Sequence, residues 1–276
     1  MTMNRKILIV VLASVAILNV QSAMAWGNWG HHIITYLAEK HLTPEAKEKC
    51  QHYLKYRLPH YSSWMDYWRH SDPFKESSYW HSSYVDENYK VVGYKGDITR
   101  DAAYQVERIV KEMENGKYHN LSDSLVAVNL KLLIHLVPDM HCPCHIGYPK
   151  GFTTARLKEM GLQGTSLKVK GKKCSRHKFW DGSPQYMHPK WKADKFITAY
   201  DTYTPKQIKK ICKGTPLKWS SQNAKRMVKT LGIWDQGDEF RDFSKEQRQQ
   251  IDDIVHEQVA YGGYRLASVL NRIFSK

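Results

Sequence analysis

The sequence contains no apolar segment long enough to cross a bilayer. Its longest mostly apolar run extends from Ile7 to Val20, about 14 residues, whereas a membrane-spanning helix needs about 20. The sequence also lacks a Pro-, Gly- or Ser-rich linker, an internal repeat and a low-complexity tract. The roughly 250 residues that follow the apolar run are therefore expected to form a single domain.

Cysteine is scarce and odd in number: the five cysteines stand at positions 50, 142, 144, 174 and 212. At most two disulfides can form among them, one thiol is left over, and the sequence does not fix the pairing. A single residue separates Cys142 from Cys144, whereas haem attachment and thioredoxin chemistry need two residues between the cysteines. A thiolate that replaces or supplements the neighbouring His145 as a metal ligand remains an alternative.

The N-terminus has the pattern of a secretory signal peptide. Arg5 and Lys6 precede the apolar run, and the stretch from Gln21 to Ala25 ends in an A-x-A cleavage pattern. Cleavage after Ala25 removes residues 1–25 and makes Trp26 the first residue of a domain over 26–276. Cleavage after Ala23 is the alternative. We expect an exported protein, periplasmic or secreted, without a membrane anchor and monomeric.

The chain carries an excess of positive charge. Its formal net charge is +15, and loss of Arg5 and Lys6 leaves 40 basic against 27 acidic residues, or +13. Such a surface attracts polyanions in a salt-dependent way. The clearest basic run comprises Lys168, Lys170, Lys172, Lys173, Arg176 and Lys178. A solvated hairpin is the ordinary explanation for this run, but it brackets His177, and we favour a role in substrate binding.

Helix signals dominate the chain, so we expect a mainly α fold. Thr43-Pro44 opens a helix to about Leu54, and Thr204-Pro205 repeats this signal. An apolar-faced helix is predicted over Asp123–Met140, with a kink at Pro138. Ser244 and Gln247 form a capping box before a last helix that runs to about Phe274. A short β-hairpin is predicted over Leu162–Lys170, where Leu167 and Val169 alternate with lysines.

Two pairs of metal-ligand residue types occur at helical spacing. His135 and Asp139 are four residues apart, so they share a helix face and can close on one ion, and His177 and Asp181 repeat this spacing. His145 follows Pro143, which should end the helix, and is better placed for a neighbouring ion. The alternative is polar residues satisfied within an apolar helix. A mixed His/Asp set without paired cysteines favours zinc.

The order of these motifs resembles a known family. WGNWGH at 26–31, SWMDYWR at 63–69, His81, HLVPDMHCPCH at 135–145 and HKFWD at 177–181 resemble the ligand motifs of the zinc-dependent single-strand nucleases and 3′-nucleotidases. These are the fungal S-one and P-one enzymes with their plant and bacterial relatives, within the zinc phospholipase C superfamily. The resemblance covers nearly all of 26–276 and implies the single compact helical domain of that type.

The resemblance also implies three zinc ions. Its ligands would be Asp66, His81, His135 and Asp139 for one ion, the Trp26 amine and carbonyl, His31 and the bridging Asp139 for a second, and His145, His177 and Asp181 for a third. A shell with only three protein ligands is typical of catalytic zinc, because it leaves positions for water. A hydroxide that bridges two ions at Asp139 would be the nucleophile, and no general-base side chain would be required.

The activity implied by the resemblance is hydrolysis of single-stranded DNA and RNA between phosphorus and O3′. The products would carry 5′-phosphates, and 3′-mononucleotides would give nucleoside and phosphate. Arg69 resembles an arginine that the family places near the scissile phosphate, with a helix salt bridge as the equal alternative.

Departures from the family concern the substrate contacts. Ser82-Ser83 stands where relatives have a base-stacking aromatic after His81, which leaves Tyr84 as the possible substitute. Ser175 stands where relatives often have asparagine. The substrate-binding candidates are accordingly Tyr84, Lys172, Lys173 and Arg176. Two other functions remain open: a phospholipase C of the same superfamily, and a catalytically silent zinc- or polyanion-binding protein.

Overall fold

The computed structural model describes residues 27–159, 167–228 and 239–275, without the side chains of residues 156 and 157. The predicted signal peptide and Trp26 therefore lie outside the described residues. The α-helices are α2 (Gly27–Lys40), α3 (Pro44–Tyr53), α4 (Trp64–Trp68), α5 (Ala102–Met113), α6 (Asp123–Asp139), α7 (Phe152–Glu159), α8 (Arg176–Met187), α9 (Ala193–Tyr200), α10 (Pro205–Ile211), α11 (Pro216–Val228) and α12 (Lys245–Phe274). The prediction of a mainly α fold is confirmed.

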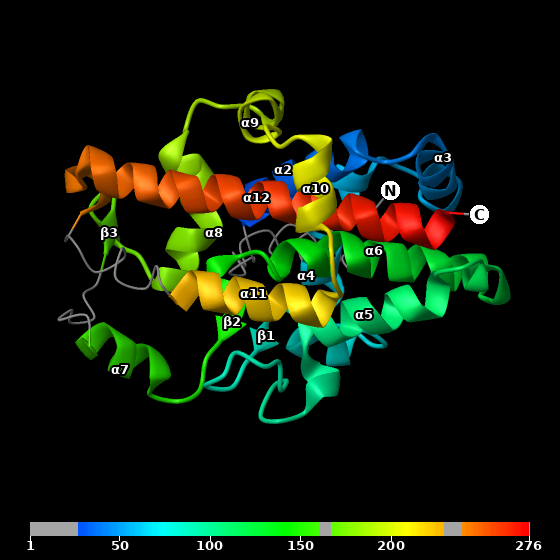
Figure 1. The fold of residues 1–276 in the computed structure, drawn as a ribbon, viewed down its shortest axis with the longest axis horizontal. Helices are drawn as coiled ribbons and strands as arrows, with labels where there is room; N and C mark the ends of the chain where they lie inside the picture. The colour runs from blue at the N-terminus through cyan, green and yellow to red at the C-terminus, as the bar shows by residue number, and fades with distance from the viewer. Residues whose placement is uncertain (1–26, 160–166, 229–238, 276) are drawn as a thin grey trace, which may run out of the picture.

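Helix α12 runs along the long axis of the molecule (Figure 1). It begins at the predicted capping box, in which Ser244 Oγ accepts the Gln247 N–H at 3.2 Å and Gln247 Oε1 accepts the Ser244 N–H at 2.6 Å. Its middle packs closely on α2, since a Cβ on Gly263 would lie 2.4 Å from Leu37 Cδ2. Only glycine permits this approach of the two helices.

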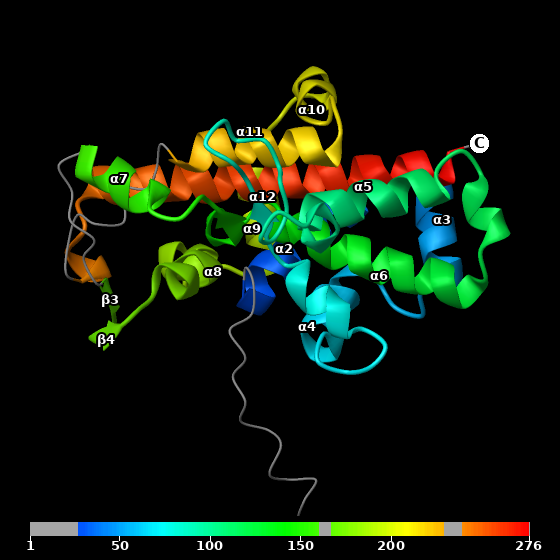
Figure 2. The ribbon, with the colours of Figure 1, turned by 90° about the horizontal axis from the view of Figure 1, so that it is seen from below.

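The apolar core has two parts that share α2 and α12. One part joins α3, α5 and α6 to the C-terminal half of α12. The other joins α8 and α9 to the N-terminal half of α12. Helices α2, α4 and α6 meet near the middle of the molecule, between these parts (Figure 2). Among the described residues, no helix combines the length and apolarity needed to span a membrane.

Helix α6 is apolar along most of its length and ends at the polar residue Asp139. Ser122 caps its start by accepting the Leu125 N–H at 3.3 Å, and the helix ends at Asp139 with Met140 as its C-cap. Pro138 lies inside the last turn. Pro143 does not end this helix, which stops four residues earlier, but opens a separate 3-10 turn, η5 (Pro143–His145). His145 lies outside the helix, as the sequence predicts.

Two short strand pairs complete the described fold. Strands β1 (Ser83–Tyr84) and β2 (Ile146–Gly147) are parallel, and β3 (Lys168–Val169) and β4 (Lys172–Lys173) form an antiparallel hairpin. This hairpin lies later than the predicted Leu162–Lys170, whose residues 162–166 are outside the described residues. The turn occurs at Lys170 and Gly171, both with positive φ, because two such residues suit the twist of a two-residue hairpin loop.

Candidate metal centre

Five buried side chains from four segments form a first cluster: His31 of α2, Asp66 of α4, His81 before β1, and His135 and Asp139 of α6. Asp139 lies at its centre. Its Oδ1 is 3.1 Å from His31 Nε2, and its Oδ2 is 3.0 Å from His81 Nδ1 and 3.3 Å from His135 Nε2. The last turn of α6 thus places one carboxylate among three imidazoles.

Asp66 joins this cluster beside two of the same imidazoles. Its Oδ1 lies 3.8 Å from His135 Nε2 and 3.9 Å from His81 Nδ1. The His135 ring is fixed by its other nitrogen, because Nδ1 donates to the Ser62 carbonyl at 2.7 Å and leaves Nε2 directed at the carboxylates. Such a backbone partner is the usual way in which a ligating histidine is oriented. The His31 ring stacks on the same imidazole at 4.3 Å between centroids.

The donor atoms of the first cluster fit a metal site. Both oxygens of Asp66, both ring nitrogens of His31, Nε2 of His81 and Oδ1 of Asp139 are buried and have no hydrogen-bond partner. Each buried unsatisfied polar group costs about 1–3 kcal/mol. A cation among these atoms would satisfy several of them at once. Two groups of three potential ligands share His135: one with His31 and Asp139, the other with Asp66 and His81.

The protonation states suit ligand roles for two of the three imidazoles. Burial lowers the pKa of His31, and burial lowers the pKa of His81 to about 4, so both rings are neutral near neutral pH. Burial also opposes the charged form of His135, but Asp139 and Asp66 outweigh it and raise its pKa to about 9. Burial alone would raise the pKa of Asp139, yet His135 and His145 hold it well below its usual range. His135 therefore carries a proton near neutral pH when no metal is bound, and a cation at its Nε2 would displace this proton.

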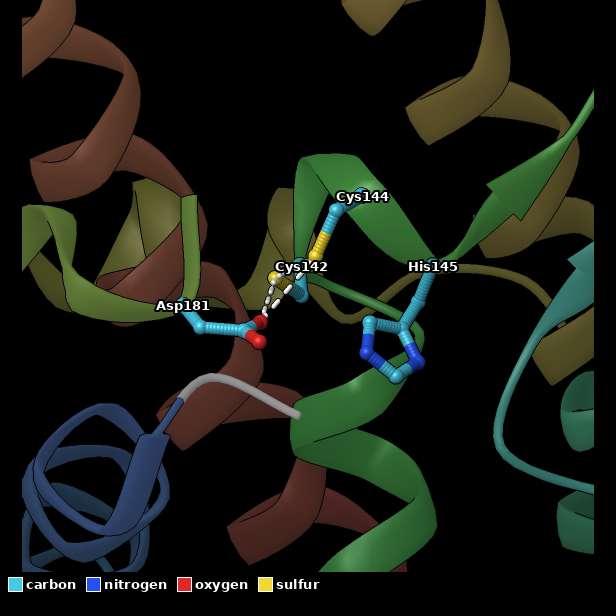
Figure 3. Close-up of side chains that lie close together, drawn as sticks. All are labelled: Cys142, Cys144, His145 and Asp181. Carbon is cyan, nitrogen blue, oxygen red and sulfur yellow. Dashed lines mark hydrogen bonds between the residues drawn. The ribbon is translucent and has the colours of Figure 1, made fainter. Parts of the chain in front are cut away.

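A second cluster lies beside the first and comprises Cys142, Cys144, His145 and Asp181, with His177 at its edge (Figure 3). Asp181 Oδ1 accepts the Cys144 thiol at 3.1 Å and the Cys142 thiol at 3.6 Å. Its Oδ2 lies 3.1 Å from His177 Nε2. The interaction with the Asp181 carboxylate raises the pKa of His177 despite partial burial.

The β1–β2 pair joins the two clusters. Its parallel register sets Ser83 opposite Ile146, two residues after His81 and one after His145. His145 Nδ1 donates to the His81 carbonyl and lies 3.9 Å from Asp139 Oδ1, while its Nε2 is buried without a hydrogen-bond partner. In the second cluster, His145 Nε2 is therefore a potential metal ligand that no other group occupies. The two clusters lie next to each other.

Eight of the nine predicted ligands lie in these two clusters, and Trp26 is outside the described residues. Arg69 also lies here: its Nη1 is 3.7 Å from Asp66 Oδ1, and its Nε is buried without a hydrogen-bond partner. The long ion pair matches the salt-bridge alternative, and the unpaired N–H leaves a donor for an anion. Among the described residues no disulfide is formed, and all five cysteines are free.

The substrate-binding candidates have different surroundings. A cavity of about 190 Å³ is lined by Arg176 together with Cys144 and His177, so this arginine borders the second cluster. Lys172 and Lys173 are exposed on β4 and line a different cavity, also of about 190 Å³.

Tyr84 is half-buried and already in contact with other side chains. Its ring occupies the space where a Cβ of Gly147 would lie, and its centroid is 5.2 Å from that of Tyr94. These contacts limit the free face that Tyr84 could offer to a base.

Two exposed aromatics were not among the predicted site residues. Tyr67 and Trp68 are 71% and 48% exposed and directly follow Asp66 on α4. The signal was present in SWMDYWR: when Asp66 points inward, the next residues of a short helix point elsewhere. His141, in contrast, lies between ligands in the sequence but has structural partners, with Nδ1 at 2.7 Å from the Val137 carbonyl and Nε2 at 2.9 Å from Arg265.

Comparison with known proteins agrees with this arrangement. The family model described as S1/P1 Nuclease matches residues 26–275, nearly the whole chain. The chain belongs to the S1/P1 nuclease family. It is 24% identical to Nuclease S1 of Aspergillus oryzae over 292 aligned residues, which cover 93% of this chain and 94% of the relative. Membership in the S1/P1 nuclease family supports a hydrolase that acts on nucleic acids, with the mainly α fold described above.

Proposed function

We propose that this protein is a zinc-dependent phosphodiesterase that hydrolyses single-stranded DNA and RNA to 5′-phosphorylated products and also dephosphorylates 3′-nucleotides. The observation that carries the proposal is the set of buried, unpaired donor atoms around Asp139. In folded proteins nearly all buried polar atoms have a hydrogen-bond partner, so a cluster of such atoms without one indicates a missing ligand. Three zinc ions remain the proposed complement, with the Trp26 amine and carbonyl completing the first cluster.

The residues of the first cluster would hold two ions on opposite oxygens of one carboxylate. His31 faces Oδ1 of Asp139, whereas His81 and His135 face Oδ2. Zinc bound there supplies Lewis acidity and a hydroxide nucleophile at neutral pH. Asp66 would supply a further ligand and a balancing charge, and the Ser62 carbonyl holds His135 with Nε2 directed at the carboxylates.

Arg69 and the surrounding surface would bind the substrate. The buried, unpaired Nε of Arg69 can donate to a phosphate oxygen while Nη1 stays near Asp66. The exposed rings of Tyr67 and Trp68 offer faces on which unpaired bases could stack. Arg176 adds a positive charge beside the cavity at Cys144 and His177. A duplex would present neither flexible backbone nor free base faces to these groups.

The test is a metal and substrate analysis of mature protein that begins at Trp26. We expect close to three zinc ions per chain after reconstitution, and faster hydrolysis of single-stranded than of duplex DNA. One ion or none would contradict the ligand sets. Cleavage of phosphatidylcholine without cleavage of nucleic acid would favour the phospholipase C alternative, and full zinc content without either activity would favour the silent binding protein.

A further inference from the structure

Cys142 and Cys144 are placed differently from the other described cysteines. Their sulfur atoms are 3.1 Å apart, and both face Oδ1 of Asp181 (Figure 3). Cys50, in contrast, packs among the apolar side chains around α3 and α6, and Cys212 packs beside the apolar group around α9. Both sulfur atoms face a carboxylate that is itself a proposed metal ligand, so both are positioned to bind the same metal ion.

His145 completes a set of four donors at this point. One ligand atom from each of Cys142, Cys144, His145 and Asp181 lies within 4.8 Å of the others. His145 Nδ1 is engaged by the His81 carbonyl, so Nε2 is the free donor, and it is buried without a hydrogen-bond partner. Four protein donors of S, S, N and O type match the tetrahedral shell that zinc prefers.

The two oxygens of Asp181 divide between different partners. Oδ1 faces the sulfur atoms, whereas Oδ2 is 3.1 Å from His177 Nε2. The His177 side chain is 43% exposed, while the Asp181 side chain is 8% exposed. An ion on the Oδ1 side would therefore be enclosed by the sulfur atoms, and His177 would orient the carboxylate through its other oxygen.

We propose that Cys142 and Cys144 supply thiolate ligands to the ion held by His145 and Asp181, so that this site is a closed Cys₂HisAsp site. The inference rests on the proposed function only in taking the ion to be zinc. Each thiol loses its proton to solvent as a sulfur–metal bond forms. His177, a ligand according to the family resemblance, lies against the other oxygen of Asp181 instead.

The sulfur ligands would change the charge and selectivity of the third site. Two thiolates and one carboxylate against one divalent ion give −1, whereas two neutral histidines and one carboxylate give +1. Thiolates also favour zinc over magnesium, calcium and manganese. The third ion would then hold η5 against α8, and the positive field for phosphate would come from the first cluster and from Arg69.

The experiment uses the complete mature protein, reduced and loaded with Co²⁺ in place of zinc. Sulfur bonded to Co²⁺ gives a charge-transfer band in the near ultraviolet that nitrogen and oxygen ligands do not give. We expect this band in the wild type, about half of its intensity in Cys142→Ser and in Cys144→Ser, and none in the double variant. Cys50→Ser and Cys212→Ser, each made singly, should keep the full band, since these cysteines lie outside the cluster.

A second measurement needs no variant. X-ray absorption at the zinc edge of wild-type protein should show sulfur at about 2.3 Å besides nitrogen and oxygen at about 2.0–2.2 Å. Bound Co²⁺ without the band, zinc without sulfur, or a disulfide between Cys142 and Cys144 in the native protein would each overturn the proposal. Nuclease activity is measured separately: sulfur ligation without hydrolysis would refute the proposed function alone, and hydrolysis without sulfur would refute this inference alone.

Discussion

The two clusters are built on different kinds of support. The first takes His135 and Asp139 from the last turn of a 17-residue helix and His31 from another long helix, and these three side chains are fully buried. The second takes its residues from a 3-10 turn and from α8, directly after a short hairpin, and one edge is open at His177. The last turn of α6 is entirely buried, and a buried helical turn fixes its side chains more rigidly than a turn with an open edge does.

This difference separates what each cluster is suited to do. In the proposed enzyme, rigid support would fix the spacing of neighbouring ions, which hydrolysis requires to within fractions of an ångström. The turn after Asp139 is held by the β1–β2 pair, by contacts with Asp181 and by the hydrogen bond from Asn223 to the Met140 carbonyl. Local sequence changes there, such as the two cysteines, can therefore alter the ligand type without disturbing α6.

The largest expected effect comes from the residue that both ions of the first cluster would share. Asp139→Asn removes the charge that faces His31, His81 and His135, so we expect a loss of about two zinc ions and a fall in hydrolysis rate of roughly a hundredfold or more. The matched change Asp181→Asn should remove about one ion. Zinc analysis and initial rates on single-stranded DNA measure both, and equal losses would show that the clusters are not organised as proposed.

The first cluster could be predicted from sequence because helical spacing is a local property. His135 and Asp139 had to share a face once the apolar pattern defined α6, and Ser122 and Ser244 marked helix starts through capping chemistry that needs no tertiary information. The contribution of distant residues such as Asp66 and His81 came from the family resemblance, since nothing local to SWMDYWR or His81 indicates which residues they meet.

The second cluster and the substrate surface could be predicted less completely. Whether Cys142 and Cys144 face Asp181 depends on how η5 packs against α8, which is a tertiary contact. The predicted hairpin position is too early in the sequence. Alternation of apolar residues and lysines indicates a strand, but the position of the turn at Lys170 and Gly171 depends on backbone conformation. The position of Tyr84 after His81 suggests a stacking role, but its packing against Gly147 is set by the β1–β2 register.

An intermediate effect should follow from changing the start of the mature chain. The proposed ligand is the α-amine of Trp26, and one alanine added before it replaces that amine with an amide nitrogen, which is a poor zinc donor. We expect the extended protein to fold, to bind about one zinc ion fewer and to hydrolyse single-stranded DNA far more slowly. Full zinc content and full activity in the extended protein would exclude a ligand role for this residue. Mass spectrometry of both proteins confirms the first residue.

The smallest effect on metal content is expected at His141. This residue lies between proposed ligands in the sequence but is not itself expected to bind metal. Its two ring nitrogens contact the Val137 carbonyl and Arg265, so neither is free for an ion. His141→Ala should leave the zinc content unchanged and lower the free energy of unfolding by about 1–3 kcal/mol, because buried polar partners lose their contacts. The same change at exposed His52 serves as the control and should alter neither quantity.

The pH dependence of unfolding in metal-free protein tests whether His141 is buried against Arg265 as a neutral ring. Burial, followed by the charge of Arg265, lowers the pKa of His141 from 6.5 to about 3. Between these values the unfolded chain binds the extra proton and the folded chain does not, so the folded state loses stability as pH falls below about 6.5. At pH 5 this loss is about 2 kcal/mol for the wild type, and His141→Ala should lack it. Denaturant unfolding of both proteins without metal at pH 7 and pH 5 measures the difference. An identical pH dependence would mean that His141 is protonated in the folded protein and that its contact with Arg265 is not formed.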